Sequence, residues 1–335
     1  MRVTLEEIAR LAGVSKATVS RVLNDIPEGV GPETRARVKA VIKHLGYDLD
    51  GFNVHGRQDV HSHNIGLILP DIANPFFSEL AREISRAAID NGYVVMLGST
   101  DFSVKVEQRI IAAFTAKKVD GVILVSVGGE CCEGHRLLER YKIPCLLLDR
   151  DVSDMKRDAL IVADNEQVSY TCCEMLISHG SFDVAYITGS SGASTSDERL
   201  RGYRRALQRF SVPYVPERIK NGNYTMESGY NAVLEMERAG TRYSAIMAAN
   251  DLMAMGAMKA LQEFGYNIPG DVEVIGFDNI VYSQYTEPTL TTVQQPTIEM
   301  GQLAVRTIID IIEGKKEVAR FARLRPKILS RKSTR

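Results

Sequence analysis

The first 47 residues place apolar side chains at the spacing of short amphipathic helices. Leu5, Ile8 and Ala12 fall on one helical face, and residues 4–7 have the form of a capping box at its start. The apolar stripes of two further helices are Val19, Val22 and Leu23, and then Val38, Val41, Ile42 and Leu45. The pattern predicts three helices that share one small core.

The turn between the first two predicted helices has the sequence Ala12-Gly13-Val14-Ser15. A glycine in such a tight turn, followed by an apolar residue, is typical of a helix-turn-helix. The second helix of that motif enters the major groove of DNA, and side chains near its start read the bases. The side chains here that can hold phosphates are Thr4, Ser15, Thr18, Ser20 and Asn24. A generic three-helix scaffold with solvated basic residues fits the same periodicity.

From Ile65 onward, short apolar runs alternate with segments of helical length, which predicts parallel sheets covered by helices. The predicted strands are residues 65–69, 93–97, 121–125, 145–148, 160–163, 184–188, 244–248 and 272–276. These are too many for one compact sheet of ordinary size, so we predict two α/β lobes divided near Leu160. Between the three helices and the lobes, residues 48–64 have the composition of a linker.

Polar side chains follow several of the predicted strands. Ligands of such folds bind at the carboxyl ends of the strands, so these side chains are candidates for one site that binds a polyhydroxyl ligand. The candidates are Asp71, Asn74, Asp149, Thr195, Arg199, Asn250, Asp251 and Asp278. A stacking face is expected from Phe76, Phe77 or Tyr224. Each Asp or Asn taken alone fits a helix N-cap better, since that is the commoner role after a strand.

Composition and charge narrow the class of protein. With 335 residues, of which 44% are hydrophobic, the chain is long enough for two or more cores. The apolar runs are too short for a membrane helix and residues 1–13 have no signal-peptide core, so we expect a cytoplasmic protein without membrane contact. The net charge is -1, but residues 1–47 carry eight Lys or Arg against five Asp or Glu, a local charge of +3. A nucleic-acid interface is therefore expected only in this segment.

Motifs for catalysis and for cofactors are missing from the sequence. It contains neither Gly-x-Gly-x-x-Gly nor a phosphate-binding Gly-x-x-x-x-Gly-Lys-Ser/Thr. His135 and His179 have no nucleophile signature nearby, and His55, His61 and His63 in the linker lack a carboxylate or cysteine cluster. The five cysteines have no Cys-x-x-Cys spacing and are expected to be reduced thiols. We expect no enzyme activity, no cofactor and no metal.

Residues 4–24, TLEEIARLAGVSKATVSRVLN, resemble the headpiece signature of the LacI/GalR family of bacterial transcription regulators. The resemblance implies a recognition helix at residues 15–24, with Lys16, Ala17 and Arg21 at the positions that read bases. It places near the DNA backbone Thr4, Leu5, Ser15, Thr18, Ser20, Asn24, Thr34 and Tyr47. The chemistry of Arg21 agrees, because its guanidinium fits a guanine edge or a phosphate.

Residues 47–57, YDLDGFNVHGR, depart from the family pattern. The family usually continues with Tyr-x-Pro-Asn and a short hinge helix whose leucine enters the minor groove. Here the proline is missing, and acidic residues stand at positions that would lie near the phosphates. Glycine or arginine occupies the position where the family has the leucine that enters the minor groove. Phe52 or Val54 are candidate apolar wedges, and a flexible tether is the alternative.

Further motifs resemble the effector domain of the same family. They are DIANPFF at 71–77, DGVI at 120–123, ERLRGY at 198–203, AND at 249–251, VIGFDN at 274–279 and PTLTTV at 288–293. The resemblance implies a domain similar to periplasmic sugar-binding proteins. It implies Arg199, Asn250 and Asp278 as polar clamps on the ligand, with Asp149 and Phe76 beside them and Tyr224 as the stacking residue. In this fold, helix 297–313 would return to the first lobe and a strand near 325–329 would lie in the second.

The expected architecture is an all-α helix-turn-helix headpiece joined to a two-lobed α/β effector domain similar to periplasmic binding proteins. The expected segments are a headpiece at 1–47, a linker at 48–64, and a domain at 65–335 with lobe 1 at 65–160 and 293–323 and lobe 2 at 161–292 and 324–335. The chain has no apolar heptad repeat at its C-terminal end, so we expect a homodimer.

The resulting functional hypothesis is a repressor of a sugar-utilisation operon, bound to double-stranded operator DNA in the nucleoid and released by a small sugar effector. Two alternatives remain at this point. The first is a repressor that needs a purine-type corepressor, which would use the same fold. The second is a sugar-binding transport protein, which would need a signal peptide and has no use for residues 1–47.

Overall fold

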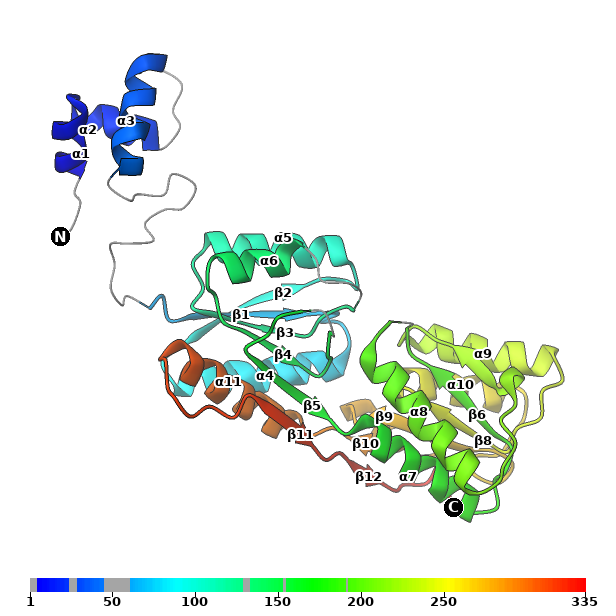
Figure 1. Ribbon diagram of the computed structural model, residues 1–335. Coiled ribbons are helices and arrows are strands. Elements are labelled where there is room, and N and C mark those ends of the chain that lie inside the picture. The colour runs from blue at the N-terminus through cyan, green and yellow to red at the C-terminus, as the bar shows by residue number, and fades with distance from the viewer. Residues whose placement is uncertain (1–4, 24–28, 45–60, 129–132, 153–154, 191) are drawn as a thin grey trace. The chain divides into compact units, whose positions relative to one another are not determined.

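The computed structural model describes residues 5–23, 29–44, 61–128, 133–152, 155–190 and 192–335 (Figure 1). It divides into two compact units, Met1–His61 and Ser62–Arg335. This division falls inside the segment 48–64 that the sequence predicts as a linker. The expected hinge residues, including Phe52 and Val54, lie outside the described residues.

The first unit contains the three predicted helices. They are α1 (Leu5–Ala12), α2 (Lys16–Leu23) and α3 (Pro32–His44). Their shared core is fully buried at Ile8, Val19 and Ile42. Gly13 adopts φ +62°, and the amides of Gly13 and Val14 donate to the carbonyls of Arg10 and Ala9, which closes the C-terminus of α1. The glycine in the turn is therefore required for the left-handed backbone that turns α1 into α2.

The first lobe of the second unit is a six-stranded parallel sheet in the order β11-β5-β4-β3-β1-β2. Its strands are β1 (Asn64–Leu69), β2 (Val94–Ser99), β3 (Gly121–Leu124), β4 (Cys145–Leu148), β5 (Ala159–Ala163) and β11 (Phe321–Leu324). Its helices are α4 (Pro75–Asp90), α5 (Val104–Ala116), α6 (Glu133–Arg140) and α11 (Thr297–Ile312). Helices α4 and α11 cover one face and α5 and α6 the other, so both faces are buried (Figure 1).

The second lobe repeats this architecture with the strand order β12-β10-β9-β8-β6-β7. Its strands are β6 (Val184–Thr188), β7 (Ile219–Asn221), β8 (Ala245–Ala248), β9 (Glu273–Asp278), β10 (Thr291–Gln294) and β12 (Lys327–Leu329). Its helices are α7 (Asn165–Ser178), α8 (Ser194–Arg209), α9 (Met226–Arg238) and α10 (Asp251–Glu263), with short 3-10 turns η1 (Pro216–Arg218) and η2 (Val281–Gln284). All strand pairs are parallel except β12 with β10.

The predicted limits of the lobes need a correction of a few residues. Leu160 lies inside β5, which pairs with β4 and β11, so the first lobe continues to Ala163. Val293 lies in β10 of the second sheet, so the chain returns to the first lobe only after Gln294. The sequence pattern does not predict β7, β10, β11 and α6, because these elements are short or lack a continuous apolar run.

Three passages join the two lobes in the part of the chain that the structure describes. The first passage follows β5, the second follows β10, and the third connects β11 of the first lobe to β12 of the second. As predicted, α11 returns to the first lobe, where it packs on α4, and the final strand pairs within the second sheet. Among the described residues, no helix is both long and apolar enough to span a membrane.

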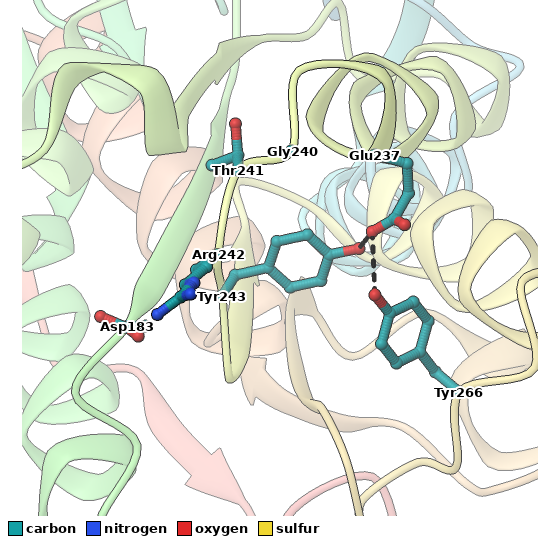
Figure 2. Close-up of a pocket in the computed structure, with 7 residues that line it drawn as sticks. All are labelled: Asp183, Glu237, Gly240, Thr241, Arg242, Tyr243 and Tyr266. Atoms are coloured by element: carbon teal, nitrogen blue, oxygen red, sulfur yellow. Dashed lines mark hydrogen bonds between the residues drawn. The ribbon is translucent and has the colours of Figure 1, made fainter.

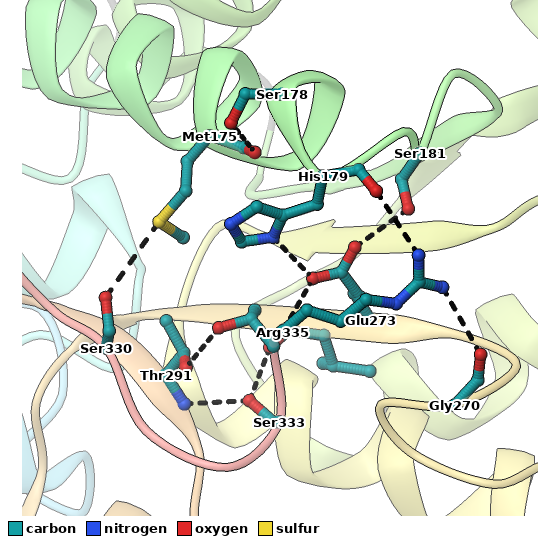
Figure 3. Close-up of polar contacts among 12 residues, drawn as sticks. Met175, Ser178, His179, Ser181, Gly270, Glu273, Thr291, Ser330, Ser333 and Arg335 are labelled. Carbon is teal, nitrogen blue, oxygen red and sulfur yellow. Dashed lines mark hydrogen bonds and ion pairs between the residues drawn. The ribbon is translucent and has the colours of Figure 1, made fainter.

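The end of the chain is held in the second lobe by the buried carboxylate of Glu273 (Figure 3). Glu273 accepts hydrogen bonds from the hydroxyl of Ser181 and the backbone amide of Arg335, both over 2.8 Å. Its Oε2 also lies 2.8 Å from Nδ1 of His179, at the C-cap of α7. Ser333 adds a hydrogen bond from its hydroxyl to the carbonyl of Val274 over 2.6 Å. The C-terminal residues thus follow β12 and are hydrogen-bonded to β9 of the second sheet.

Candidate functional site

Helix α2 presents the polar face that the sequence predicts for a recognition helix. Lys16, Ala17 and Arg21 are exposed, whereas Val19 and Val22 are buried in the core. A helix that is held by its apolar face leaves the opposite face free for the edges of DNA bases. The predicted reading positions are therefore accessible in this unit.

The N-terminus of α2 is capped by Ser15. Its Oγ accepts a hydrogen bond from the amide of Thr18 over 3.1 Å and lies 2.9 Å from the Thr18 hydroxyl. The Lys16 ammonium forms an exposed ion pair with Glu6 of α1, and this contact lowers the pKa of the Glu6 carboxyl. This ion pair joins the start of α2 to α1.

The guanidinium of Arg21 lies against Gly29, in the segment before α3. A Cβ atom built on Gly29 would lie 3.1 Å from a terminal nitrogen of Arg21, and Gly29 has φ +81°. Of the other predicted DNA contacts, Ser20 and Thr34 are half-buried on α2 and α3, and Leu5 begins α1. Thr4, Asn24 and Tyr47 lie outside the described residues.

A second candidate site is a polar cluster at the carboxyl ends of strands from both lobes. We define the junction cluster as Phe102, Asp149, Arg150, Tyr186, Arg199, Tyr224, Asp278 and Gln295. Contacts across the lobes place it at their junction: the rings of Phe102 and Tyr224 stack at 6.3 Å with an interplanar angle of 8°. The amide of Asp151 also donates to the hydroxyl of Ser194 over 3.0 Å. The junction cluster thus contains residues of both lobes.

Arg199 is held by groups of its own lobe. Its Nε donates to Oδ1 of Asn165 over 2.9 Å, and Nη1 donates to the carbonyl of Ala249 over 2.5 Å. Its Cζ lies 3.7 Å from the centre of the Phe277 ring, and Nη2 lies 3.9 Å from a carboxylate oxygen of Asp278. These contacts fix the guanidinium beside Asp278.

The two carboxyls of the junction cluster have shifted pKa values. Burial raises the pKa of Asp278 to about 7, although the neighbouring Arg199 opposes the shift. Burial also raises the pKa of Asp149, against the effect of Arg150 and Arg199. With a pKa of about 7, the Asp278 carboxyl can donate as well as accept hydrogen bonds near neutral pH, which suits a ligand rich in hydroxyl groups.

Several buried polar atoms of the junction cluster have no hydrogen-bond partner among the described residues. They are Oδ1 of Asp149, Nε of Arg150, and the hydroxyls of Tyr186 and Tyr224. Leaving such groups unpaired is costly, so a concentration of them marks a place where a polar ligand is expected. Positive φ angles at Asp149 (65°), Tyr224 (67°) and Asp278 (106°) show that the same positions carry backbone strain.

Other predicted effector residues have structural roles. Asn74 caps α4 by accepting from the amide of Phe76 over 3.1 Å, and Asn250 caps α10 by accepting from Met253 over 2.9 Å. Oδ1 of Asp71 accepts from the amide of Ala73 over 2.8 Å. Asn250 also donates from its amide to the Tyr224 carbonyl over 3.0 Å, which ties the cap to the cluster.

Two further predicted residues are buried beside these elements. Phe76 lies in the core of the first lobe against Phe77, and Thr195 lies in the first turn of α8. The structure adds Phe102, Arg150, Tyr186 and Gln295, which the sequence pattern does not predict as site residues. Arg150 adjoins the selected Asp149, so adjacency was the one signal that would have found it.

A pocket of about 420 Å³ lies at the opposite end of the second lobe (Figure 2). It is near the starts of β6 and β8, whereas the junction cluster lies beyond the strand ends. Glu237 accepts hydrogen bonds from the hydroxyls of Tyr243 and Tyr266, the latter over 3.1 Å, and Arg218 pairs with Asp183. These contacts satisfy the acidic groups of the pocket within the protein, so it offers less to a ligand than the junction cluster does.

A helix-turn-helix unit joined to a two-lobed α/β domain has the architecture of a DNA-binding regulator. Family comparisons agree with this description. Residues 4–49 match the family "bacterial regulatory proteins, lacI family", and residues 173–334 match a "periplasmic binding protein-like domain". The chain is 32% identical to catabolite control protein A of Priestia megaterium, over the whole of both chains. It is 31% identical to the transcriptional repressor PurR of Proteus mirabilis, over 98% of this chain and 96% of the relative.

Solved structures show the same relationship. The complex of the transcriptional regulator CelR with cellobiose is 29% identical and has a TM-score of 0.76, covering 99% of this chain and 100% of that one. The lac repressor dimer bound to operator and the anti-inducer ONPF is 26% identical with a TM-score of 0.73, covering 100% and 99%. The chain belongs to the LacI/GalR family of bacterial transcription regulators. It is a DNA-binding regulator, as its headpiece predicts.

Proposed function

We propose that this regulator represses a sugar-utilisation operon and that a small sugar bound at the junction cluster releases it from its operator. The observation that carries the proposal is the set of unpaired buried polar atoms at the strand ends of both lobes, beside the stacked rings of Phe102 and Tyr224. A sugar supplies hydroxyls that can pair with the buried polar atoms and a ring face that can lie against the aromatic rings. The CelR structure, with cellobiose bound, is consistent with this ligand class.

The residues that we propose as effector contacts are those predicted from the sequence. Arg199, Asp149 and Asp278 supply charge and hydrogen bonds, and Tyr224 supplies the stacking face. The supporting positions are Asp71, Asn74, Phe76, Thr195 and Asn250. A ligand that contacts both lobes favours one arrangement of the lobes over another, which is the physical basis of an effector response.

The proposed DNA interface is the exposed side of α2, with Lys16, Ala17 and Arg21 reading bases. In the cell we place the protein in the cytoplasm, associated with the nucleoid through its operator. A pseudo-palindromic operator is expected, because two headpieces of a homodimer would occupy its half-sites.

The surface that we assign to the homodimer is the β2 edge of the first lobe. Val94 and Leu97 on this edge strand are 61% and 48% exposed, and Ile89 on the neighbouring α4 is 67% exposed. An exposed apolar edge strand is a liability unless a partner covers it, and the related lac repressor is a dimer. Val94→Asp is expected to shift the sedimentation of the full chain from dimer to monomer. A Val94→Asp chain that sediments unchanged would place the interface elsewhere.

The test of the proposed function measures operator binding and effector binding on the same full-length protein. Thermal unfolding is followed against sugars, sugar phosphates and purines, and each compound that raises the Tm is then added to an operator-binding titration. A ligand at about 100 times its Kd stabilises by about 2.7 kcal/mol, which is readily measured. A sugar that raises the Tm and weakens operator binding supports the proposal. A purine that raises the Tm and tightens operator binding would replace it with corepression.

A further inference from the structure

Arg150 follows β4 and is 4% exposed, in the middle of an aromatic enclosure. Its Cζ lies 5.8 Å from the ring centre of Phe77 and 5.9 Å from those of Phe102 and Tyr224. Phe77 and Phe102 belong to the first lobe and Tyr224 to the second. The guanidinium is therefore enclosed at the junction of the lobes and away from bulk water.

The hydrogen bonding of Arg150 is sparse for a buried guanidinium. Nη1 donates to the carbonyl of Ser126 over 3.3 Å, and Nε, which lies 3.7 Å from a carboxylate oxygen of Asp149, makes no hydrogen bond. A guanidinium carries five donors in a rigid fork, and burial without matching acceptors is costly. Arg199, by contrast, donates to two close acceptors of its own lobe.

This difference separates the two arginines by role. Arg199 is a fixed part of the second lobe, whereas Arg150 keeps a buried donor for a group that the protein does not supply. The planar fork of arginine matches the two oxygens of a carboxylate or phosphate. The carboxyls in reach do not meet this demand, since Asp149 lies beyond hydrogen-bond distance of Nε and is itself left with an unpaired Oδ1.

Resting on the proposed effector site, we propose that the effector is an acidic sugar, whose carboxylate or phosphate is bound by Arg150 while its ring lies against Phe102 and Tyr224. A neutral sugar would leave the Nε donor of Arg150 unpaired, and the anionic group satisfies it. The Asp149 and Asp278 carboxyls, whose pKa values are raised by burial, then contact the hydroxyls of the ring.

The test compares matched ligands on the full-length protein. D-glucose, D-glucuronate and glucose 6-phosphate form one set, and the galactose series forms a second, each read by thermal unfolding and by calorimetric titration. An acidic member is expected to bind roughly 10- to 100-fold more tightly than its neutral partner. Comparison of the uronates with the sugar phosphates shows whether the site prefers a carboxylate or a phosphate. Inorganic phosphate is the probe for the anion site itself, measured against sodium chloride at equal ionic strength.

Variants assign any preference to Arg150. Arg150→Gln is expected to remove the preference for the acidic sugar and the effect of inorganic phosphate, and Arg150→Lys to retain part of both. The matched control is Arg238→Gln, which removes the same charge from an exposed position at the end of α9. The Tm of each unliganded variant shows whether it folds, and the lysine variant serves if the glutamine variant does not.

The outcomes separate this inference from the proposed function. If a neutral sugar binds as tightly as its acidic partner, the proposal of a sugar effector is retained and the proposal of an acidic effector is refuted. If neither an acidic sugar nor inorganic phosphate raises the Tm above the chloride control, the acidic effector is likewise refuted. If only a purine binds, the sugar effector of the proposed function fails as well.

Discussion

The guanidinium of Arg331 donates a hydrogen bond to Oδ1 of Asn279 over 2.6 Å and so ties the C-terminal segment to the residue after Asp278. Nη1 of the same side chain donates over 2.8 Å to the hydroxyl of Ser283 and to the carbonyl of Leu290. Asn279 has φ 54° and Asp278 has φ 106°, so the loop is held in a conformation that side chains rarely adopt. Arg331 thereby fixes the backbone that carries an effector candidate.

Arg331→Ala is expected to lower the free energy of unfolding by roughly 2 to 4 kcal/mol, because three charge-assisted hydrogen bonds are lost. Effector affinity is expected to fall as well, because the strained loop at Asp278 loses its support. Chemical denaturation and effector titration measure the two effects. Arg331→Lys keeps the charge but cannot reach Asn279 and Leu290 together, so it should resemble alanine in effector affinity. A lysine variant with wild-type affinity would reduce the role of Arg331 to its charge.

Asp278 is expected to make the stability of the folded chain depend on pH. Its pKa is raised by burial to about 7 in the folded protein, compared with an ordinary value of 3.8. Between about pH 4 and 7, the folded state therefore holds a proton on Asp278 that the unfolded chain has released. The contribution of Asp278 to the free energy of unfolding is complete below about pH 4 and is lost as the pH rises through about 7. The loss amounts to roughly 4 kcal/mol.

Chemical denaturation between pH 4 and 8 measures the free energy of unfolding as a function of pH. The variant Asp278→Asn removes the contribution of the Asp278 carboxyl to this pH dependence. Asp90→Asn, at an exposed position near the end of α4, is the matched control and should follow the wild-type curve. If Asp278→Asn also follows the wild-type curve, Asp278 is ionised in the folded protein.

Arg199→Lys is expected to weaken the effector response of operator binding roughly tenfold or more. A lysine ammonium keeps the charge beside Asp278 but cannot donate to Asn165 and Ala249 in the fixed geometry of the guanidinium. Operator affinity is titrated with and without effector. Equal losses in both titrations would show a general defect instead of an effector contact.

Arg21→Ala is expected to weaken operator binding by about 1 to 3 kcal/mol if the guanidinium reads a base. Fluorescence anisotropy on operator and on random DNA separates base reading from phosphate contact. Arg37→Ala, on the exposed side of α3, is the control for loss of one positive charge. An equally large loss on both DNAs would assign Arg21 to the phosphates.

The elements of the fold were largely predictable because their burial follows from periodicity. The apolar stripe around Ile8 and Val19 closes the headpiece core, and the continuous apolar runs became the central strands of the two sheets. Edge strands were not predictable in the same way. Strand β11, for example, exposes Phe321 and pairs on one side only, so its sequence carries no continuous apolar signal.

The site was predictable in outline and not in detail. Asp149 and Tyr224 follow strands, and Asp278 is the last residue of β9, so the topology brings these positions to the same edges of the sheets. Arg199 lies in α8, the helix that follows β6. Whether a polar residue caps a helix or faces a ligand depends on three-dimensional geometry, so Asn74 could not be separated from the others by sequence. Arg150 stands in no motif, and its significance comes from the three rings around it.

The three passages of the chain between the lobes have a consequence for synthesis on the ribosome. Neither lobe is a continuous stretch of sequence: the first sheet is completed by β11 and the second by β12, both after residue 320. The headpiece, in contrast, is contained in residues 1–61. A nascent chain therefore carries its DNA-binding unit long before either lobe can close its sheet. A product truncated before β11 would keep the headpiece and lack a complete effector domain to control it.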